Sequence, residues 1–190
     1  MIIIDSGPLV AAVNVRDRHH QACARLLRTH PGPLLVPATV ATEVCQLVEK
    51  RQGSKADAAF LRSFGAGLTL VDLTERDLQR MGDLVETYAS LPLGAVDASV
   101  IAIAERLGVT EVATLDRRHF TVVRPQHTGA LMLLPERLRA LSRPAALSGV
   151  IPRPKRHWRE LAICCLKRST TTSNTFLRCR TATAASAARA

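Results

Sequence analysis

Four acidic residues have the types and positions to do chemistry together: Asp5, Glu43, Asp97 and Asp116. Two of them follow short apolar runs, and two lie near the start of helical patterns. In open α/β sheets the carboxyl ends of parallel strands meet at one edge, where ligands bind. Two carboxylates about 5 Å apart repel by roughly 3 kcal/mol at an effective dielectric near 20. Clustered acids therefore need protons or divalent metal ions to offset that repulsion.

The elements that would bring these acids together follow from the hydrophobic pattern of residues 1–134. Short apolar runs alternate with longer helical patterns, which is typical of a parallel sheet with crossover helices. We expect strands at 1–4, 34–36, 68–71, 111–115 and 121–124, and helices at roughly 8–14, 17–30, 38–52, 54–65, 74–89 and 95–107. Asp5 and Asp116 then end strands, whereas Asp97 lies in the first turn of a nearly all-apolar helix.

Each acid alone also has a purely structural explanation. Asp97 can cap its own helix, since acids in a first turn bond free N–H groups and favour the helix dipole. Asp5 and Asp116 can each simply open a turn, and Glu43 lies on the polar stripe of its helix. Together, however, three strand–helix junctions carry acids and a fourth acid lies within reach, which favours one shared site.

Three polar neighbours are further candidates. Ser6 is expected to cap the first helix, and its hydroxyl could also position Asp5 or a metal-bound water. Arg117 and Arg118 could hold substrate phosphates, although an exposed charged loop explains them equally well. Three histidines have no partner at metal-ligand spacing and are expected at the surface: His19, His20 and His119.

The charge of the chain is unevenly distributed. The 190 residues are 47% hydrophobic and carry a net charge of +10. Residues 1–134 hold 14 basic and 14 acidic residues, whereas residues 135–190 hold 12 and 2. We therefore expect a folded domain at 1–135 and a basic, low-complexity, disordered extension at 136–190. The high isoelectric point describes that extension, so any binding of a polyanion by the domain depends on local arrangement.

The remaining composition narrows the class of protein. The five cysteines form neither a CxxC pair nor a zinc spacing, which favours a reduced, cytoplasmic chain. No apolar run approaches the roughly 20 residues of a membrane span, and Asp5 interrupts the apolar N-terminus, which disfavours a secretory signal.

Four short segments resemble the successive motifs of PIN-domain ribonucleases, in order and at ordinary spacing. They are Ile3-Ile4-Asp5-Ser6, Ala41-Thr42-Glu43-Val44, Asp97-Ala98-Ser99-Val100-Ile101-Ala102 and Thr114-Leu115-Asp116-Arg117-Arg118-His119-Phe120. The chain is most similar to the VapC-like toxins of bacterial type II toxin–antitoxin operons, over residues 1 to about 135. The extension beyond about residue 140 has no counterpart in that family pattern.

The resemblance implies an α/β/α sandwich with a central, mainly parallel sheet and a Mg²⁺- or Mn²⁺-dependent endoribonuclease activity. It implies a cognate antitoxin that neutralises the toxin, and assembly as a homodimer or as a toxin–antitoxin hetero-oligomer. The four family acids correspond to Asp5, Glu43, Asp97 and Asp116, all of them present. We expect Asp5 and Asp97 as principal metal ligands, Asp116 as a further ligand, and Glu43 as a ligand or as the group that orients the attacking water.

Two other classes of function stay open at the level of sequence. A strand-end aspartate can be the nucleophile of a phosphatase or phosphotransferase, but that chemistry usually needs a second acid two positions later, where Gly7 stands. Alternatively, the acids could dock a basic peptide without catalysis. Trapping an acyl-phosphate would identify the first class, and metal-dependent RNA cleavage would exclude the second.

Overall fold

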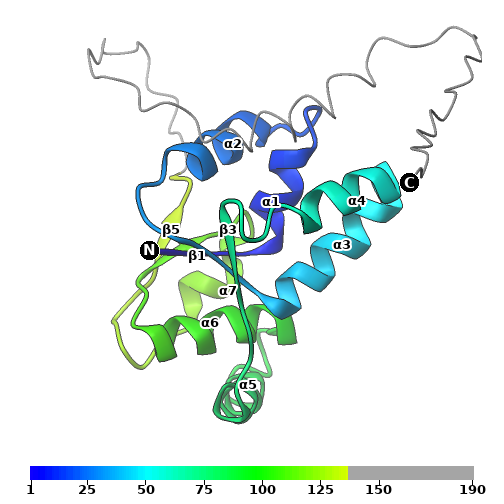
Figure 1. The fold of residues 1–190 in the computed structure, drawn as a ribbon. Helices are drawn as coiled ribbons and strands as arrows, with labels where there is room; N and C mark the ends of the chain where they lie inside the picture. Colours follow the sequence, from blue (N-terminus) through cyan, green and yellow to red (C-terminus); the bar gives the residue numbers. More distant parts are fainter. Residues whose placement is uncertain (137–190) are drawn as a thin grey trace, which may run out of the picture.

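Five parallel strands form the centre of the computed structural model, which describes residues 1–136 (Figure 1). The strand order is β3-β2-β1-β4-β5, with bounds β1 Ile2–Ile4, β2 Leu34–Pro37, β3 Leu68–Val71, β4 Glu111–Ala113 and β5 Met132–Leu134. Residues 137–190, and with them nearly all of the expected basic extension, lie outside the described residues.

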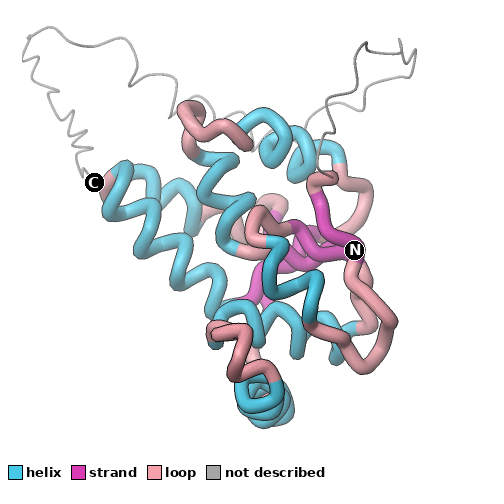
Figure 2. The backbone as a smooth tube through the Cα atoms, turned by 180° about the vertical axis from the view of Figure 1, so that it is seen from behind, coloured by secondary structure: helices cyan, strands magenta, loops and turns pink. Residues whose placement is uncertain are grey.

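Seven helices connect these strands within residues 1–136. Their bounds are α1 Ser6–Val13, α2 His20–Thr29, α3 Ala38–Gln52, α4 Ser54–Leu61, α5 Glu75–Thr87, α6 Ala95–Leu107 and α7 Arg117–Val122. Helices α1 and α2 lie on one side of β1, and α6 and α7 lie on the other (Figure 1). Seen from behind, the strands occupy the middle of the molecule with helices around them (Figure 2). The expected α/β/α architecture is confirmed, and all strand pairs within the described residues are parallel.

Strand β1 lies at the centre of the sheet. Ile3 is in register with Leu35 of β2 on one side and with Val112 of β4 on the other. All three β1 residues are fully buried, as expected for a parallel strand covered on both faces. The strand order reverses between β1 and β4, and such a switch point is where α/β folds form their binding crevice. Asp5 and Asp116 follow these two strands.

Helix α6, which carries Asp97, is held firmly against its surroundings. Its residues 98–104 are all buried, and Gly108, with φ 63°, ends the helix in the left-handed conformation. Two ion pairs tie its outer end to α5, from Arg80 to Glu105 at 2.7 Å and from Arg106 to Asp77 at 2.9 Å. The first turn of α6 is therefore a rigid support for a functional side chain.

One strand expectation is wrong. Residues 121–124 were expected as a strand, but Thr121 and Val122 end helix α7. Phe120 anchors that helix in the core, being 1% exposed, and this burial overrides the local strand preference. The fifth strand forms instead at Met132–Leu134, where no element was expected.

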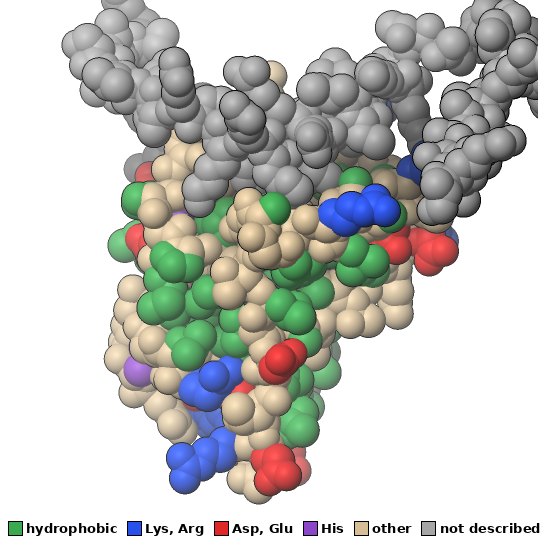
Figure 3. All heavy atoms as spheres, in the orientation of Figure 1, with side chains coloured by type: hydrophobic (Ala, Val, Ile, Leu, Met, Phe, Trp, Pro, Cys, Tyr) green, Lys and Arg blue, Asp and Glu red, His purple; other side chains and the backbone are tan. Residues whose placement is uncertain are grey.

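Two surface properties bear on binding. No helix within residues 1–136 is long and apolar enough to cross a membrane. The face drawn in Figure 3 shows basic and acidic side chains interspersed with apolar ones, without a large field of one sign. This agrees with the neutral charge balance of residues 1–134 and leaves polyanion binding to local groups.

Candidate functional site

Asp5 is the most buried of the four acids, with 5% of its surface exposed. It follows β1 and caps helix α1, where its Oδ1 accepts a hydrogen bond from the Ser6 backbone N–H at 2.6 Å. The capping group is thus Asp5 rather than Ser6, because the helix begins at Ser6, two residues earlier than expected. The Asp5 backbone N–H also donates to the Ala113 carbonyl, so both the main chain and the carboxylate are fixed.

Thr114 links the first acid to the fourth. Its buried hydroxyl donates to Oδ2 of Asp5 at 2.8 Å. The Thr114 hydroxyl oxygen also accepts a hydrogen bond from the Asp116 backbone N–H at 3.1 Å. Sequence reasoning assigned Thr114 no role. The available signal was its position between a buried strand and an acid, where a threonine hydroxyl can both donate and accept a hydrogen bond.

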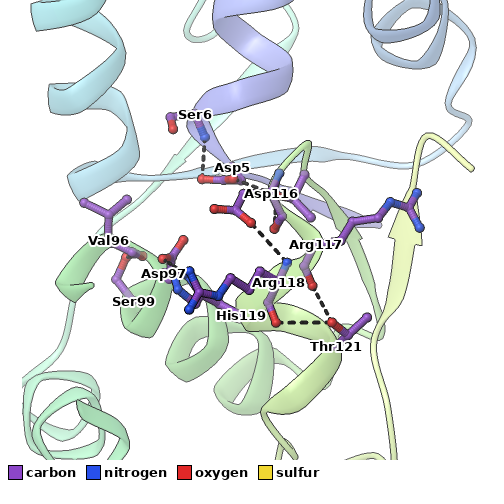
Figure 4. Close-up of polar contacts among 11 residues, drawn as sticks. Asp5, Ser6, Val96, Asp97, Ser99, Asp116, Arg117, Arg118, His119 and Thr121 are labelled. Carbon is purple, nitrogen blue, oxygen red and sulfur yellow. Dashed lines mark hydrogen bonds and ion pairs between the residues drawn. The ribbon is translucent and has the colours of Figure 1, made fainter. Parts of the chain in front are cut away.

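Asp116 combines a capping role with exposure to solvent. Its Oδ1 accepts from the Arg118 backbone N–H at 3.0 Å and so caps α7. A local ion pair between Asp116 and Arg117, which would also explain this acid, is not formed within residues 1–136. Instead, the Arg117 guanidinium donates to the carbonyls of Leu133 and Pro135 and points away from the acids toward β5 (Figure 4).

Asp97 does not cap its own helix. Gly94 is the N-cap of α6 and provides no side-chain bond, while the Asp97 carboxylate is bonded to a side chain from another element. His119 of α7 lies with Nδ1 2.7 Å from Oδ2 of Asp97 (Figure 4). Within residues 1–136 the Asp97 carboxylate bonds none of the backbone N–H groups of α6, so hydrogen-bonded capping does not explain this aspartate, although its charge still favours the helix dipole.

Glu43 approaches the same region from helix α3. It is half-buried and forms no hydrogen bond within residues 1–136. One turn before it, the Thr39 hydroxyl is 2.6 Å from the Ser99 hydroxyl, which in turn donates to the Val96 carbonyl. This contact joins the first turns of α3 and α6, so the helices of Glu43 and Asp97 are held together at their N-terminal ends.

The four carboxylates form one electrostatic cluster. The pKa of Asp5 is raised to about 6, mainly by burial and also by the charges of Asp97 and Glu43, with hydrogen bonds from Thr114 and Ser6 opposing the rise. Burial also raises the pKa of Asp97, with His119 opposing and the charges of Asp116 and Glu43 adding to the effect. Every acid of the predicted set is therefore within electrostatic reach of at least one other, as the sequence analysis required.

These residues fit a divalent cation by donor type. All four offer carboxylate oxygens, which Mg²⁺ and Mn²⁺ prefer, and their mutual repulsion is the kind that a cation relieves. As positioned, no three His, Cys, Asp or Glu side chains within residues 1–136 already form a metal-binding group. Binding a cation would therefore require these carboxylates to lie closer together than they do here.

An open pocket of about 480 Å³ lies beside the cluster. Its lining residues come from the end of β4 and from α7: Leu115, Asp116, Arg117, Arg118 and Thr121. Asp116 links this pocket to the acids, and Arg118 is exposed at its wall. Of the three expected substrate contacts, Arg118 is the one best placed to meet a ligand, because Ser6 lies in the first turn of α1 and Arg117 is engaged with β5.

A pH-dependent stability term follows from the raised pKa of Asp5. In the metal-free protein, the folded state holds the Asp5 proton more tightly than the unfolded state, so the contribution of Asp5 to stability is fully present below about pH 4. It should fall as the pH rises through about 6, by roughly 3 kcal/mol for a shift of this size. Urea unfolding with chelator present, at pH 4 to 7, should show this loss in the wild type and a flatter profile in Asp5→Asn. Equal slopes for the two proteins would contradict the assignment.

Comparison with known proteins adds evidence on ancestry. The sequence profile of the family described as PIN domain matches residues 2–124. Ribonuclease VapC26 of Mycobacterium tuberculosis is 29% identical over 135 residues, which span 70% of this chain and 100% of that protein.

Two solved structures share the fold. VapC20 of Mycobacterium tuberculosis, described as a sarcin–ricin loop cleaving toxin, matches with a TM-score of 0.56 at 19% identity, over 59% of this chain and 87% of that chain. VapBC2 of Rickettsia felis, solved with a DNA fragment from their promoter, matches with a TM-score of 0.53 at 18% identity, over 70% of this chain and 97% of that chain. At these identities the likeness is one of fold.

Proposed function

This chain belongs to the PIN-domain family, and from that membership we propose that it is a metal-dependent endoribonuclease of the VapC toxin type. It would be the toxic component of a type II toxin–antitoxin pair. The observation that carries the proposal is the convergence of four acids, from β1, α3, α6 and β4, into one electrostatic cluster at the switch point of the sheet. The similarity to Ribonuclease VapC26 supports RNA as the substrate.

Asp5, Asp97 and Asp116 would hold Mg²⁺ or Mn²⁺, with Glu43 as a further ligand or as the group that orients the attacking water. When bound, the cation supplies positive charge against the charge that develops on the phosphate and activates water for attack. Glu43 suits the second role because its carboxylate makes no hydrogen bond within residues 1–136 and is free to accept one from water. Such a mechanism needs no covalent nucleophile.

Substrate RNA would be held by local groups rather than by bulk charge. The pocket beside Asp116 adjoins the acids and exposes Arg118, whose guanidinium can pair with a phosphate oxygen. Ser6 lies next to Asp5 and could contact the same backbone, whereas Arg117 would act indirectly by fixing α7 to β5.

The phosphotransferase alternative is disfavoured at position 7. A Cβ atom built on Gly7 would lie 3.2 Å from the Leu115 Cβ, tighter than most contacts, so this position has little room for the second acid of that mechanism. A basic peptide would offset the repulsion of the four acids as a cation does, so the non-catalytic alternative is excluded by metal-dependent RNA cleavage rather than by the electrostatics. Neither alternative gains support from a specific contact within the described residues.

A cognate antitoxin is part of the same proposal. The chain of similar fold from Rickettsia felis is described as VapBC2, and this protein would likewise pair with the product of a neighbouring gene. Expression of this chain alone should then inhibit growth, and co-expression of the neighbouring product should relieve the inhibition. Undisturbed growth at high expression of an RNA-cleaving protein would argue against the toxin role while leaving the nuclease intact.

The chemistry is tested by the ends of the cleaved RNA. If water attacks, every product carries a simple phosphate and a hydroxyl at the two new ends. If the ribose 2′-OH attacks, one end carries a cyclic phosphate. Incubating purified protein with total RNA and Mg²⁺ should give fragments without cyclic phosphate ends. Ligation of adapters that require a particular end group distinguishes the two kinds of end. Cyclic ends would show that the acids do not work by activating water.

A further inference from the structure

His119 was expected at the surface, yet it is the one histidine within residues 1–136 that contacts an acid of the cluster. Resting on the nuclease function proposed above, we propose that His119 is a positioning residue that holds the Asp97 carboxylate in place for a divalent cation. It would act through Asp97 rather than touch the substrate. The contact is short, 2.7 Å from Nδ1 to Oδ2, and both side chains are largely buried, with 13% and 20% exposed.

Three contacts hold helix α7 and with it the backbone of His119. Asp116 caps the start of α7 through the Arg118 N–H, and the next residue, Phe120, is buried in the core. Arg117 ties the same helix to the carbonyls at the end of β5. A side chain on so restrained a helix can dictate the position of its partner, whereas a loop side chain would follow it.

Helix α6 fixes the backbone of Asp97, and within residues 1–136 His119 is the hydrogen-bond partner of its carboxylate. Its carboxylate forms no other hydrogen bond within residues 1–136, and the charges of Asp116 and Glu43 act on it from nearby. An ionised carboxylate only accepts hydrogen bonds, so Nδ1 of His119 must donate. The bond occupies Oδ2 and leaves Oδ1 without a hydrogen-bond partner among the described residues 1–136. Groups that orient a ligating carboxylate in this way typically contribute 10- to 100-fold to metal affinity.

The same helix thus governs two of the four acids. Asp116 stands at the N-terminus of α7, and His119, three residues later, reaches Asp97 on α6 (Figure 4). Helix α7 is the element that sets the separation of these two carboxylates. A mere packing role for His119 would need its volume only, whereas the positioning role needs an N–H at the location of Nδ1.

Three substitutions in the full-length chain separate these roles. Asparagine can present its amide N–H near the location of Nδ1, glutamine presents it near Nε2, and leucine keeps volume alone. Mn²⁺ affinity, measured by calorimetry without RNA, should fall about 10- to 100-fold in His119→Leu and His119→Gln. His119→Asn should stay close to the wild type. Metal-free melting temperatures check that each variant folds. If one variant does not melt cooperatively, the comparison uses the remaining two variants.

A matched control is His20→Leu, which removes a half-buried histidine whose Nδ1 lies 3.0 Å from the Ala11 carbonyl, away from the acids. It should change stability but not Mn²⁺ affinity. In an Asp97→Asn background, His119→Leu should weaken Mn²⁺ no further, because the two residues act as a unit.

Unchanged Mn²⁺ affinity in folded His119→Leu would overturn the inference, and so would equal losses in the Asn and Gln variants. Neither result would contradict metal binding or RNA cleavage by the wild-type protein. Failure of the wild type itself to bind Mn²⁺ or cleave RNA would overturn the proposed function instead. The two failures are therefore distinguishable.

Discussion

Replacing Asp97 with asparagine should abolish RNA cleavage while the protein stays folded. The substitution keeps the shape of the side chain, and the amide oxygen can still accept the hydrogen bond from His119. It removes the negative charge that would hold the cation, and a catalytic metal contributes several kcal/mol to transition-state stabilisation. We expect the rate on a fixed RNA to fall by at least about 100-fold, since each 1.4 kcal/mol is a factor of ten.

Folding of the Asp97→Asn protein should be retained or improved. Burial and the neighbouring carboxylates raise the pKa of Asp97, which means that the charged form is disfavoured in the folded state. A neutral amide avoids that cost, so urea unfolding of the metal-free protein at pH 7 should show equal or greater stability. Loss of cleavage then cannot be attributed to unfolding.

Asp83→Asn is the matched control, because Asp83 is an exposed acid on α5 that lies outside the cluster and forms no salt bridge within residues 1–136. Its cleavage rate should equal that of the wild type. If Asp97→Asn cleaved RNA at near the wild-type rate, the assignment of Asp97 to the metal would be wrong. Asp5→Asn should behave like Asp97→Asn, and Glu43→Gln should be equally or less severe.

Much of the fold and the candidate acids was predictable, because both depend on patterns that are local in sequence. The helices at 38–52 and 95–107 have the predicted bounds, since apolar periodicity and terminal glycines mark them clearly. Asp5 and Asp116 could be grouped without a structure because parallel strands bring their carboxyl ends to one edge. The remaining step, that α3 and α6 begin at that same edge, follows from the alternation of strands and helices.

What could not be predicted depends on contacts between distant segments. Strand β5 lies beyond the last expected element, and its pairing with β4 is a contact that the local pattern does not show. Thr114 and His119 looked ordinary because their partners, Asp5 and Asp97, are 109 and 22 residues away along the chain. Such side chains become functional candidates only when the fold shows what they touch.

Removal of divalent metal should have the largest effect of all, because it acts on all four acids at once. We expect excess chelator to abolish cleavage and Mg²⁺ or Mn²⁺ to restore it. Ca²⁺ should bind without comparable turnover, since it is larger and less exacting in its coordination geometry. Persistent cleavage in excess chelator would contradict a metal-dependent mechanism.

Metal should also stabilise the fold, and this effect can be measured without RNA. The charged carboxylates repel one another when no cation is bound, and the raised pKa of Asp5 reflects part of that cost. A cation at 100 times its dissociation constant adds about 2.7 kcal/mol to the free energy of unfolding. For a domain of this size, that corresponds to a rise in melting temperature of roughly 10 °C.

The location of the stabilising cation is decided by comparing variants. Asp5→Asn and Asp97→Asn should lose most of the Mn²⁺-dependent rise in melting temperature, because each removes a carboxylate of the cluster. Asp83→Asn should keep the full rise. If all three variants kept it, the cation would bind elsewhere on the chain, and the acids at the switch point would have to gather for another reason. Because this readout needs no RNA, it separates loss of metal binding from loss of the chemical step.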